Sequence, residues 1–153
     1  MVKFILIIII ITLILPDFSG KVIGVMDGDT IEVLNSDNKP IRVRLAAIDC
    51  PEKAQPFGSK AKQFTASLCF GKVVTVKPTG TDQYGRTLAN IILPDGRSLN
   101  EEILRSGFAW HYKKYSSDEK LSLLEKEASK NKIGLWIDPN PIAPWDFRKL
   151  SIK

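Results

Sequence analysis

Cysteine and histidine are scarce in this sequence, which holds Cys50, Cys69 and His111 among 153 residues. A structural zinc site needs four ligands, usually with a close cysteine pair, so a zinc-based fold is excluded. Two cysteines also exclude a disulfide scaffold; we interpret them as small hydrophobic residues near the core, and a single bridge stays open. No paired nucleophile accompanies His111, which favours a structural role over general-base catalysis.

Repeats, low-complexity tracts and an excess of glycine or proline are absent too, which excludes collagen-like and low-complexity classes. A chain of 153 residues is enough for one domain, and such a domain buries roughly two-thirds of its unfolded surface. The 22 basic side chains outnumber the 17 acidic ones. This excess of positive charge favours polyanionic partners, either nucleic acid or anionic lipid.

The one long apolar run lies at the N-terminus, where residues 4–15 are uncharged and follow Lys3. This run is too short to cross a hydrocarbon core of about 30 Å comfortably, and it fits the apolar region of a secretory signal. We therefore predict a signal peptide or signal-anchor over residues 1–20 and a domain over residues 21–153. The protein would be exported, secreted or periplasmic, with membrane contact confined to the N-terminal segment, and anchored there if the signal is not cleaved.

Short runs rich in β-branched residues are separated by turn residues and predict five strands. They cover residues 21–25, 30–34, 41–45, 73–77 and 88–93. Asp27-Gly28 between the first two runs is typical of a type I′ hairpin turn. Five short strands with an inserted helix and a helical C-terminal part indicate the α+β class, with a five-stranded Greek-key barrel of the oligonucleotide-binding (OB) type and about three helices.

The three expected helices follow the third and fifth strands. Apolar residues at positions 57, 61, 64 and 68 have helical spacing and predict the first. Ser98 and Glu101 form a capping-box pattern ahead of a short second helix. Ser116 and Glu119 repeat that pattern ahead of a longer third helix, which ends near residues 131–134.

Acidic residues gather in two turns of the predicted barrel. Asp27 and Asp29 lie in the first, and Asp49 and Glu52 follow the third strand, where Pro51 restricts the backbone. Carboxylate and carbonyl oxygens are the ligands that calcium prefers. Solvated turns also contain such residues, so a cation site and an ordinary turn both remain open at this point.

Arginines follow a similar pattern on neighbouring segments. Arg42 and Arg44 are two apart on a strand and share one face, from which a guanidinium group can bind phosphate bidentately. Arg86 ends the segment Asp-Gln-Tyr-Gly-Arg, in which Tyr84 could stack on a base. Taken one at a time, these residues are equally typical of a solvent-facing strand or turn.

The motifs taken in order resemble the staphylococcal nuclease family over about residues 22–136. They are Asp-Gly-Asp-Thr at 27–30, Arg-x-Arg-Leu-x-x-Ile-Asp-x-Pro-Glu at 42–52, Asp-x-Tyr-Gly-Arg at 82–86, Leu-Asn-Glu at 99–101 and Gly-Phe-Ala-Trp at 107–110. The resemblance implies a calcium-dependent nuclease that hydrolyses DNA and RNA with little sequence preference and leaves 3′-phosphate ends. We expect such a protein to act as a monomer.

The resemblance also implies a role for each matching residue. Asp29 and Asp49 would bind Ca²⁺ together with the backbone carbonyl of Cys50, and Asp27 would support that loop. Glu52 would hold or activate the attacking water. The remaining residues would contact the substrate: Arg44 and Arg86 at the scissile phosphate, Tyr84 against the nucleotide, and Tyr112 and Tyr115 near a terminal phosphate.

Two alternatives from other classes stay open. An OB-like module could keep the fold, bind nucleic acid and lack catalysis, but such modules typically lose the acidic and arginine residues that this sequence retains. A membrane-surface protein could use lysine-rich helix faces on anionic lipid, a hypothesis based on the N-terminal segment and the positive charge alone.

Overall fold

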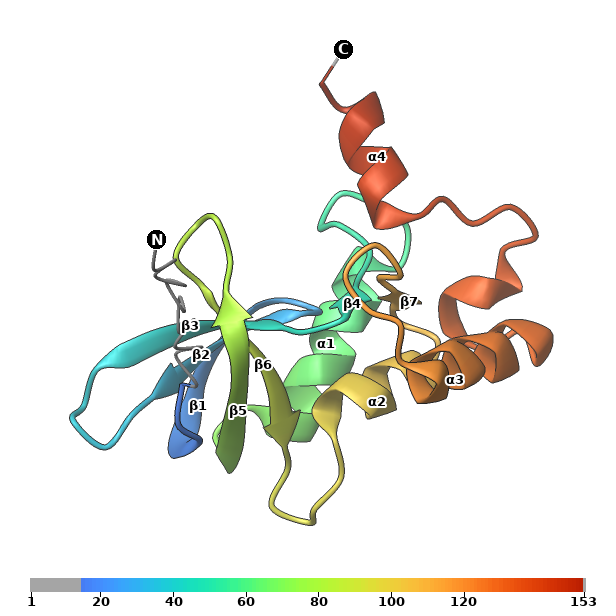
Figure 1. Ribbon diagram of the computed structural model, residues 1–153. Helices are drawn as coiled ribbons and strands as arrows, with labels where there is room; N and C mark the ends of the chain where they lie inside the picture. Colours follow the sequence, from blue (N-terminus) through green and yellow to red (C-terminus); the bar gives the residue numbers. More distant parts are fainter. Residues whose placement is uncertain (1–14, 153) are drawn as a thin grey trace, which may run out of the picture.

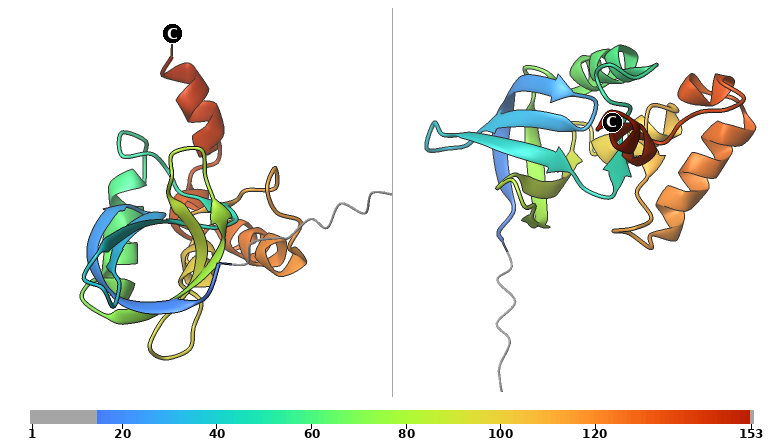
Figure 2. Two further views of the ribbon diagram at one scale, coloured as in Figure 1. Left: turned by 60° about the vertical axis from the view of Figure 1, so that its left-hand side comes forward. Right: turned by 90° about the horizontal axis from the view of Figure 1, so that it is seen from above.

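All five predicted strand regions form strands, and they close into one barrel in the computed structural model, which describes residues 15–152 (Figure 1). The strands are β1 (Phe18–Asp27), β2 (Thr30–Leu34), β3 (Pro40–Leu45), β5 (Val73–Thr81) and β6 (Thr87–Ile92). Their order around the barrel is β1-β2-β3-β6-β5, and the parallel pairing of β3 with β6 completes the closure that Figure 2 shows end-on. The predicted α+β class and OB-like barrel are confirmed.

Alternation of apolar and polar residues decides which side chains fill the barrel. On β3, Val43 and Leu45 are completely buried, whereas Arg42 is exposed and Arg44 lies between these extremes. The other strands supply the rest of the barrel interior, which includes Val22, Ile31, Val33, Val76, Ala89 and Ile91. Because successive side chains of a strand point to opposite faces, burial of Val43 and Leu45 directs Arg44 to the outside of the barrel wall.

Helices cover one side and one end of the barrel (Figure 2). They are α1 (Gly58–Cys69), α2 (Leu99–Arg105) and α3 (Glu119–Lys130), followed by the 3₁₀ helix η1 (Gly134–Ile137) and α4 (Pro144–Leu150). Helix α1 packs against β1, and α2 packs against both α1 and α3. The three predicted helices are present. Helix α4 was not predicted, because it is short and buries only Pro144, so no apolar stripe marks it.

The barrel begins earlier in the chain than predicted. Residues 18–21 of β1 pair with residues 73–76 of β5, so the strand includes three residues that the prediction assigned to the N-terminal signal. The apolar core of that signal falls mostly on residues 1–14, outside the described residues, and the export signal stays a prediction. Within residues 15–152, no helix is long and apolar enough to cross a membrane.

Two details of the local predictions were wrong. The hairpin at Gly28 exists, but neither central residue has a positive φ, so the turn is not type I′. A Cβ on Gly28 would lie 2.9 Å from side-chain atoms of Cys50 and Ala61, so close packing explains the glycine. The N-cap of α3 was also predicted wrongly. Asp118 caps the helix in place of Ser116, and its carboxylate accepts from two backbone N–H groups.

Both cysteines are unpaired and buried, as expected of small core residues. Burial raises the pKa of Cys69 to about 12. The pKa of Cys50 is also raised well above its ordinary value, by burial and by the neighbouring carboxylate of Asp29. Both thiols therefore stay protonated at neutral pH, which makes them poor nucleophiles.

Candidate active site

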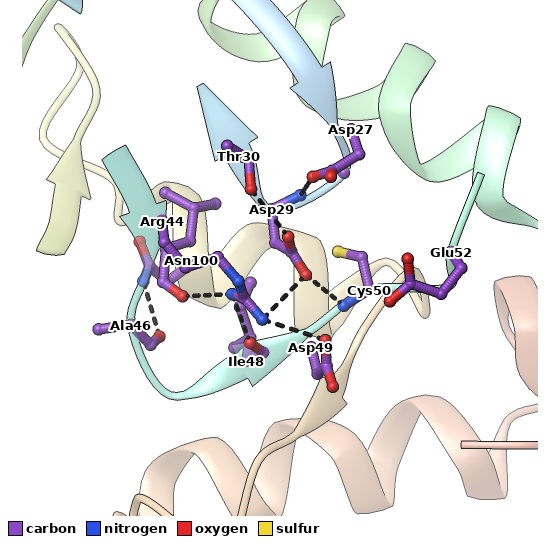
Figure 3. A network of polar contacts seen from close by, with 12 residues as sticks. Asp27, Asp29, Thr30, Arg44, Ala46, Ile48, Asp49, Cys50, Glu52 and Asn100 are labelled. Carbon is purple, nitrogen blue, oxygen red and sulfur yellow. Dashed lines mark hydrogen bonds and ion pairs between the residues drawn. The ribbon is translucent and has the colours of Figure 1, made fainter. Parts of the chain in front are cut away.

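A tight turn over residues 46–47 leads from β3 into the short strand β4 (Ile48–Asp49), and it is held from several sides (Figure 3). Ala47 has a φ of 66°, a left-handed conformation that costs a non-glycine residue roughly 1–2 kcal/mol. Arg44 Nη1 donates to the carbonyls of Leu45 and Ile48 at 2.7 and 2.8 Å, and Asn100 Nδ2 donates to the Ala46 carbonyl at 3.0 Å. These side chains fold the turn so that Asp49 comes back toward Arg44.

Strand β4 is fixed on its other side by the two-residue strand β7 (Trp110–His111). The strands are antiparallel, with Asp49 opposite Trp110. The backbone N–H of Tyr112 also donates to the Ala47 carbonyl at 2.8 Å. The Gly-Phe-Ala-Trp segment of the sequence therefore contributes backbone that positions the acidic segment.

Arg44 lies between two buried carboxylates (Figure 3). Its Nη2 is 3.0 Å from Asp49 Oδ1 and 3.3 Å from Asp29 Oδ2. Burial opposes the charge of this guanidinium group, but Asp29 and Asp49 outweigh that effect and raise the pKa of Arg44. The side chains of Asp29 and Asp49 are 8% and 2% exposed, so little water screens this cluster.

The buried environment of Asp29 disfavours the charged form of its carboxyl group. Burial raises its pKa to about 7, with further contributions from Asp27 and Asp49, while Arg44 acts in the opposite direction. Its Oδ2 accepts the backbone N–H of Cys50 at 2.6 Å. Burial is the largest cause of the rise and Arg44 offsets only part of it, so a cation beside this carboxylate would favour its charged form.

Asp27 supports this arrangement without reaching its centre. Its Oδ1 accepts the backbone N–H of Asp29 at 3.1 Å, which fixes the turn between β1 and β2. The next residue along the chain, Thr30, donates from Oγ1 to Asp29 Oδ1 at 3.3 Å. The structure thus brings together Asp27, Asp29, Arg44, Asp49 and Cys50, all of which the sequence singled out (Figure 3).

Glu52 lies at the more exposed edge of the site, with 38% of its side chain accessible. Its carboxylate accepts from Arg148 Nη1 at 2.6 Å, and the same guanidinium group bonds both oxygens of Asp49, at 3.3 and 2.7 Å. Arg148 lies on α4, 96 residues beyond Glu52 and 99 beyond Asp49. Arg148 was not predicted as a site residue, because no motif links residues that far apart.

Arg86 reaches the site from the turn between β5 and β6. Its Nε is 2.7 Å from Asp82 Oδ2, and its Nη1 donates to Thr30 Oγ1 at 3.5 Å, the hydroxyl that also bonds Asp29. The guanidinium group lies over the ring of Tyr84, 5.5 Å from the ring centre, and 74% of Tyr84 is exposed. Arg86 therefore lies at the rim of the cluster, with an exposed aromatic ring beside it.

Tyr112 and Tyr115 lie apart from Tyr84, in an aromatic group at the base of α4. Their rings meet edge to face at 4.8 Å, and Tyr112 stacks on Trp145 of α4 at 5.1 Å. Trp145 also contacts Trp110 at 5.7 Å. Tyr112 is thus partly used for packing, while Tyr115 is 68% exposed.

Asp29 and Asp49 offer carboxylate oxygens of the kind that bind a divalent cation. Over residues 15–152, no three His, Cys, Asp or Glu side chains converge in an arrangement that would hold an ion. Two carboxylates, those of Asp29 and Asp49, share Arg44 Nη2 as a neighbour. Their oxygens are the hard ligands that calcium takes, together with backbone carbonyls and water. The carboxylates of Asp29 and Asp49 are therefore chemically suitable ligands for calcium. In the structure they pair with the guanidinium groups of Arg44 and Arg148.

His111 is not part of this cluster. Its Nδ1 and Nε2 each lie 2.9 Å from a serine hydroxyl, those of Ser122 and Ser116, which explains why Ser116 does not cap α3 as predicted. Its backbone N–H donates to Glu125 at 2.6 Å. With both ring nitrogens bonded inside the fold, His111 has the structural role that the sequence indicated.

Burial lowers the pKa of His111 below 6.5. The unfolded chain therefore takes up a proton on this residue at a pH where the folded chain does not, and the contribution of His111 to stability falls as the pH drops below about 6.5. Urea denaturation from about pH 5.5 to about pH 8 should show a smaller acid loss for His111→Gln than for the wild type. A constant difference between the two proteins across this range would contradict the expectation.

Comparison with known proteins points to one family. A family model described as staphylococcal nuclease homologue matches residues 42–138. An Escherichia coli protein named uncharacterized endonuclease is 45% identical over 132 residues, 86% of this chain and 86% of the relative. The micrococcal nuclease of Shigella flexneri is 43% identical over 145 residues, 88% and 83% of the two chains. The Arabidopsis thaliana staphylococcal-like nuclease CAN1 is 37% identical over 111 residues, 72% of this chain and 34% of the relative.

Proposed function

Because the chain belongs to the staphylococcal nuclease family and is a hydrolase that acts on nucleic acid, we propose that it cleaves DNA and RNA in a calcium-dependent reaction with little sequence specificity, leaving 3′-phosphate ends. The observation that supports this proposal most is the shared environment of Asp29, Arg44 and Asp49, with Glu52 at its open edge. A non-catalytic binding module has no need for this costly buried charge cluster.

The acidic residues of the site have two different roles in phosphodiester hydrolysis. Asp29 and Asp49 would hold Ca²⁺ with the carbonyl of Cys50, and the bound ion supplies positive charge to the phosphate as it is attacked. Glu52 accepts a proton from the attacking water or orients it, which requires a carboxylate within one hydrogen bond. Its exposure at the edge of the cluster leaves it accessible to water and substrate.

The arginines stabilise the charge that develops on the phosphate oxygens. Arg44 is held rigidly by two backbone carbonyls, so its Nη2 end keeps its direction without reorganisation. Arg86 approaches from the β5–β6 turn, with Tyr84 exposed beside it for a base to stack on. A guanidinium group is a poor proton donor in proteins, so the role of both arginines is electrostatic rather than proton transfer.

The proposal extends to where and how the protein acts. The apolar N-terminal run of the sequence supports export, with anchoring to a membrane if the signal stays uncleaved. The closed barrel leaves no unpaired barrel edge for a second copy to extend, which supports action as a monomer. The positive net charge of +5 supports attraction of nucleic acid at low salt.

The test is an assay of the purified chain on plasmid DNA, a single-stranded oligonucleotide and RNA, in calcium, in magnesium and in a chelator. We expect degradation in calcium, none in chelator, and products that release inorganic phosphate from their 3′ ends on phosphatase treatment. Undiminished cleavage in chelator would refute the calcium requirement. Products with 5′-phosphate ends would refute the proposed position of the broken bond.

A further inference from the structure

Helix α4 delivers a positive charge into the acidic site. Arg148 Nη2 lies 2.7 Å from Asp49 Oδ2, and Nη1 lies 2.6 Å from Glu52 Oε1 and 3.3 Å from Asp49 Oδ1. One guanidinium group thus bridges the residue proposed to bind the ion and the residue proposed to handle the water. These hydrogen bonds raise the pKa of Arg148 above its ordinary value, and the hydrogen bond to Asp49 contributes most.

The two arginines that share Asp49 are held very differently. Arg44 is 12% exposed, comes from the rigid barrel wall and donates to two backbone carbonyls as well. Arg148 is 40% exposed, and all its side-chain hydrogen bonds within the described residues go to Asp49 and Glu52. If Arg148 leaves, Asp49 therefore keeps Arg44 as a partner and is not stranded as an unpaired buried charge.

Helix α4 itself has few attachments. Figures 1 and 2 show it projecting away from the barrel and the other helices. Pro144 is its one buried residue, and Leu150 near its end is 61% exposed. Apart from Arg148, two aromatic residues attach it: Trp145 stacks on Tyr112 and contacts Trp110, and Phe147 lines a cavity with Pro51 and Leu135. Since α4 is short and has only one buried residue, it is among the segments that open locally at a lower free energy than the core.

We propose that Arg148 is an intramolecular competitor of the divalent cation, so that α4 blocks the site until the ion displaces it. The proposal rests on the calcium site of the proposed function. Both oxygens of Asp49 accept from Arg148, whereas a calcium ion must take carboxylate oxygens at about 2.3–2.6 Å. Arg44 takes only Oδ1 of Asp49, so Oδ2 becomes available to the ion only when Arg148 leaves. Ion binding and release of Arg148 are therefore one event, which also frees Glu52.

The test compares calcium binding by calorimetry in the wild type, Arg148→Gln and Lys149→Gln. Lys149→Gln is the matched control, because it removes the same charge from the same helix. Lys149 pairs with the exposed Asp146 and not with the acidic site. Arg148→Gln should bind calcium about tenfold more tightly than Lys149→Gln, the low end of what a charge-assisted hydrogen bond contributes. Hydrogen exchange of residues 144–150 should speed up in the wild type when calcium is added.

Three results would overturn the proposal. Equal calcium affinity in all three proteins, or weaker binding by Arg148→Gln, would mean that Arg148 does not compete with the ion, while the calcium site itself would stand. Unchanged exchange of α4 on calcium binding would show that the helix stays docked. Absence of binding in every protein would remove the calcium site of the proposed function, and the competition with it.

Discussion

Glu52→Gln is expected to lower the rate of nucleic acid hydrolysis by roughly 10²–10⁴-fold, the range for loss of a general base. Glutamine keeps the shape of the side chain and can still accept a hydrogen bond from Arg148, but it cannot take a proton from water. Because 38% of the Glu52 side chain is already exposed, the substitution should change folding stability little. The loss should therefore appear in kcat with the fold intact.

The measurement is the cleavage rate of plasmid DNA and of an oligonucleotide in saturating calcium. Glu127→Gln, on the exposed face of α3, makes the same chemical change away from the site and should leave the rate unaltered. Thermal unfolding of both variants checks that they fold. Activity of Glu52→Gln within a few-fold of the wild type would remove Glu52 from the reaction.

Asn100→Ala is expected to lower the free energy of unfolding by about 2–4 kcal/mol, since each buried backbone group left without a partner costs roughly 1–3 kcal/mol. Asn100 is 1% exposed; its Oδ1 accepts the Ile91 N–H at 3.1 Å, and its Nδ2 donates to the Ala46 carbonyl at 3.0 Å. Alanine leaves both groups unpaired and opens a small cavity between α2 and the barrel. The turn that presents Asp49 also loses one of its supports.

Urea denaturation followed by tryptophan fluorescence measures this effect. Asn140→Ala is the control, because Asn140 is exposed. We also expect weaker calcium binding by Asn100→Ala, because the turn over residues 46–47 is less fixed. A loss of stability below about 1 kcal/mol would show that water or a local shift satisfies the freed groups.

Local patterns made much of the fold predictable. Alternation on β3 distinguished the buried Val43 and Leu45 from the outward Arg44, and Ser98 caps α2 as the capping-box pattern predicted. These signals succeed because they depend on neighbours a few residues away in the chain. The second capping box failed for the opposite reason: the hydroxyl of Ser116 bonds the ring of His111 from another element, and Asp118 caps α3 instead.

The candidate site was predictable only in part. The order of motifs identified the acidic residues and two arginines, and the structure brings Asp29, Arg44 and Asp49 into one cluster. The same motifs contained Asn100 in Leu-Asn-Glu, but no sequence pattern indicates that it holds the turn of Ala46. Nothing in the sequence connected Arg148 to Asp49.

The sequence by itself determined the strands of the barrel, the main helices and the residue types of the site, because periodicity, turn residues and motif order are properties of neighbouring positions. The tertiary structure alone decided which charges meet. The left-handed turn at Ala47, the pairing of β4 with β7 and the position of Arg148 on Asp49 and Glu52 all depend on contacts between distant segments. Electrostatic energy depends on distance in space and on burial, and both are fixed only once the chain has folded.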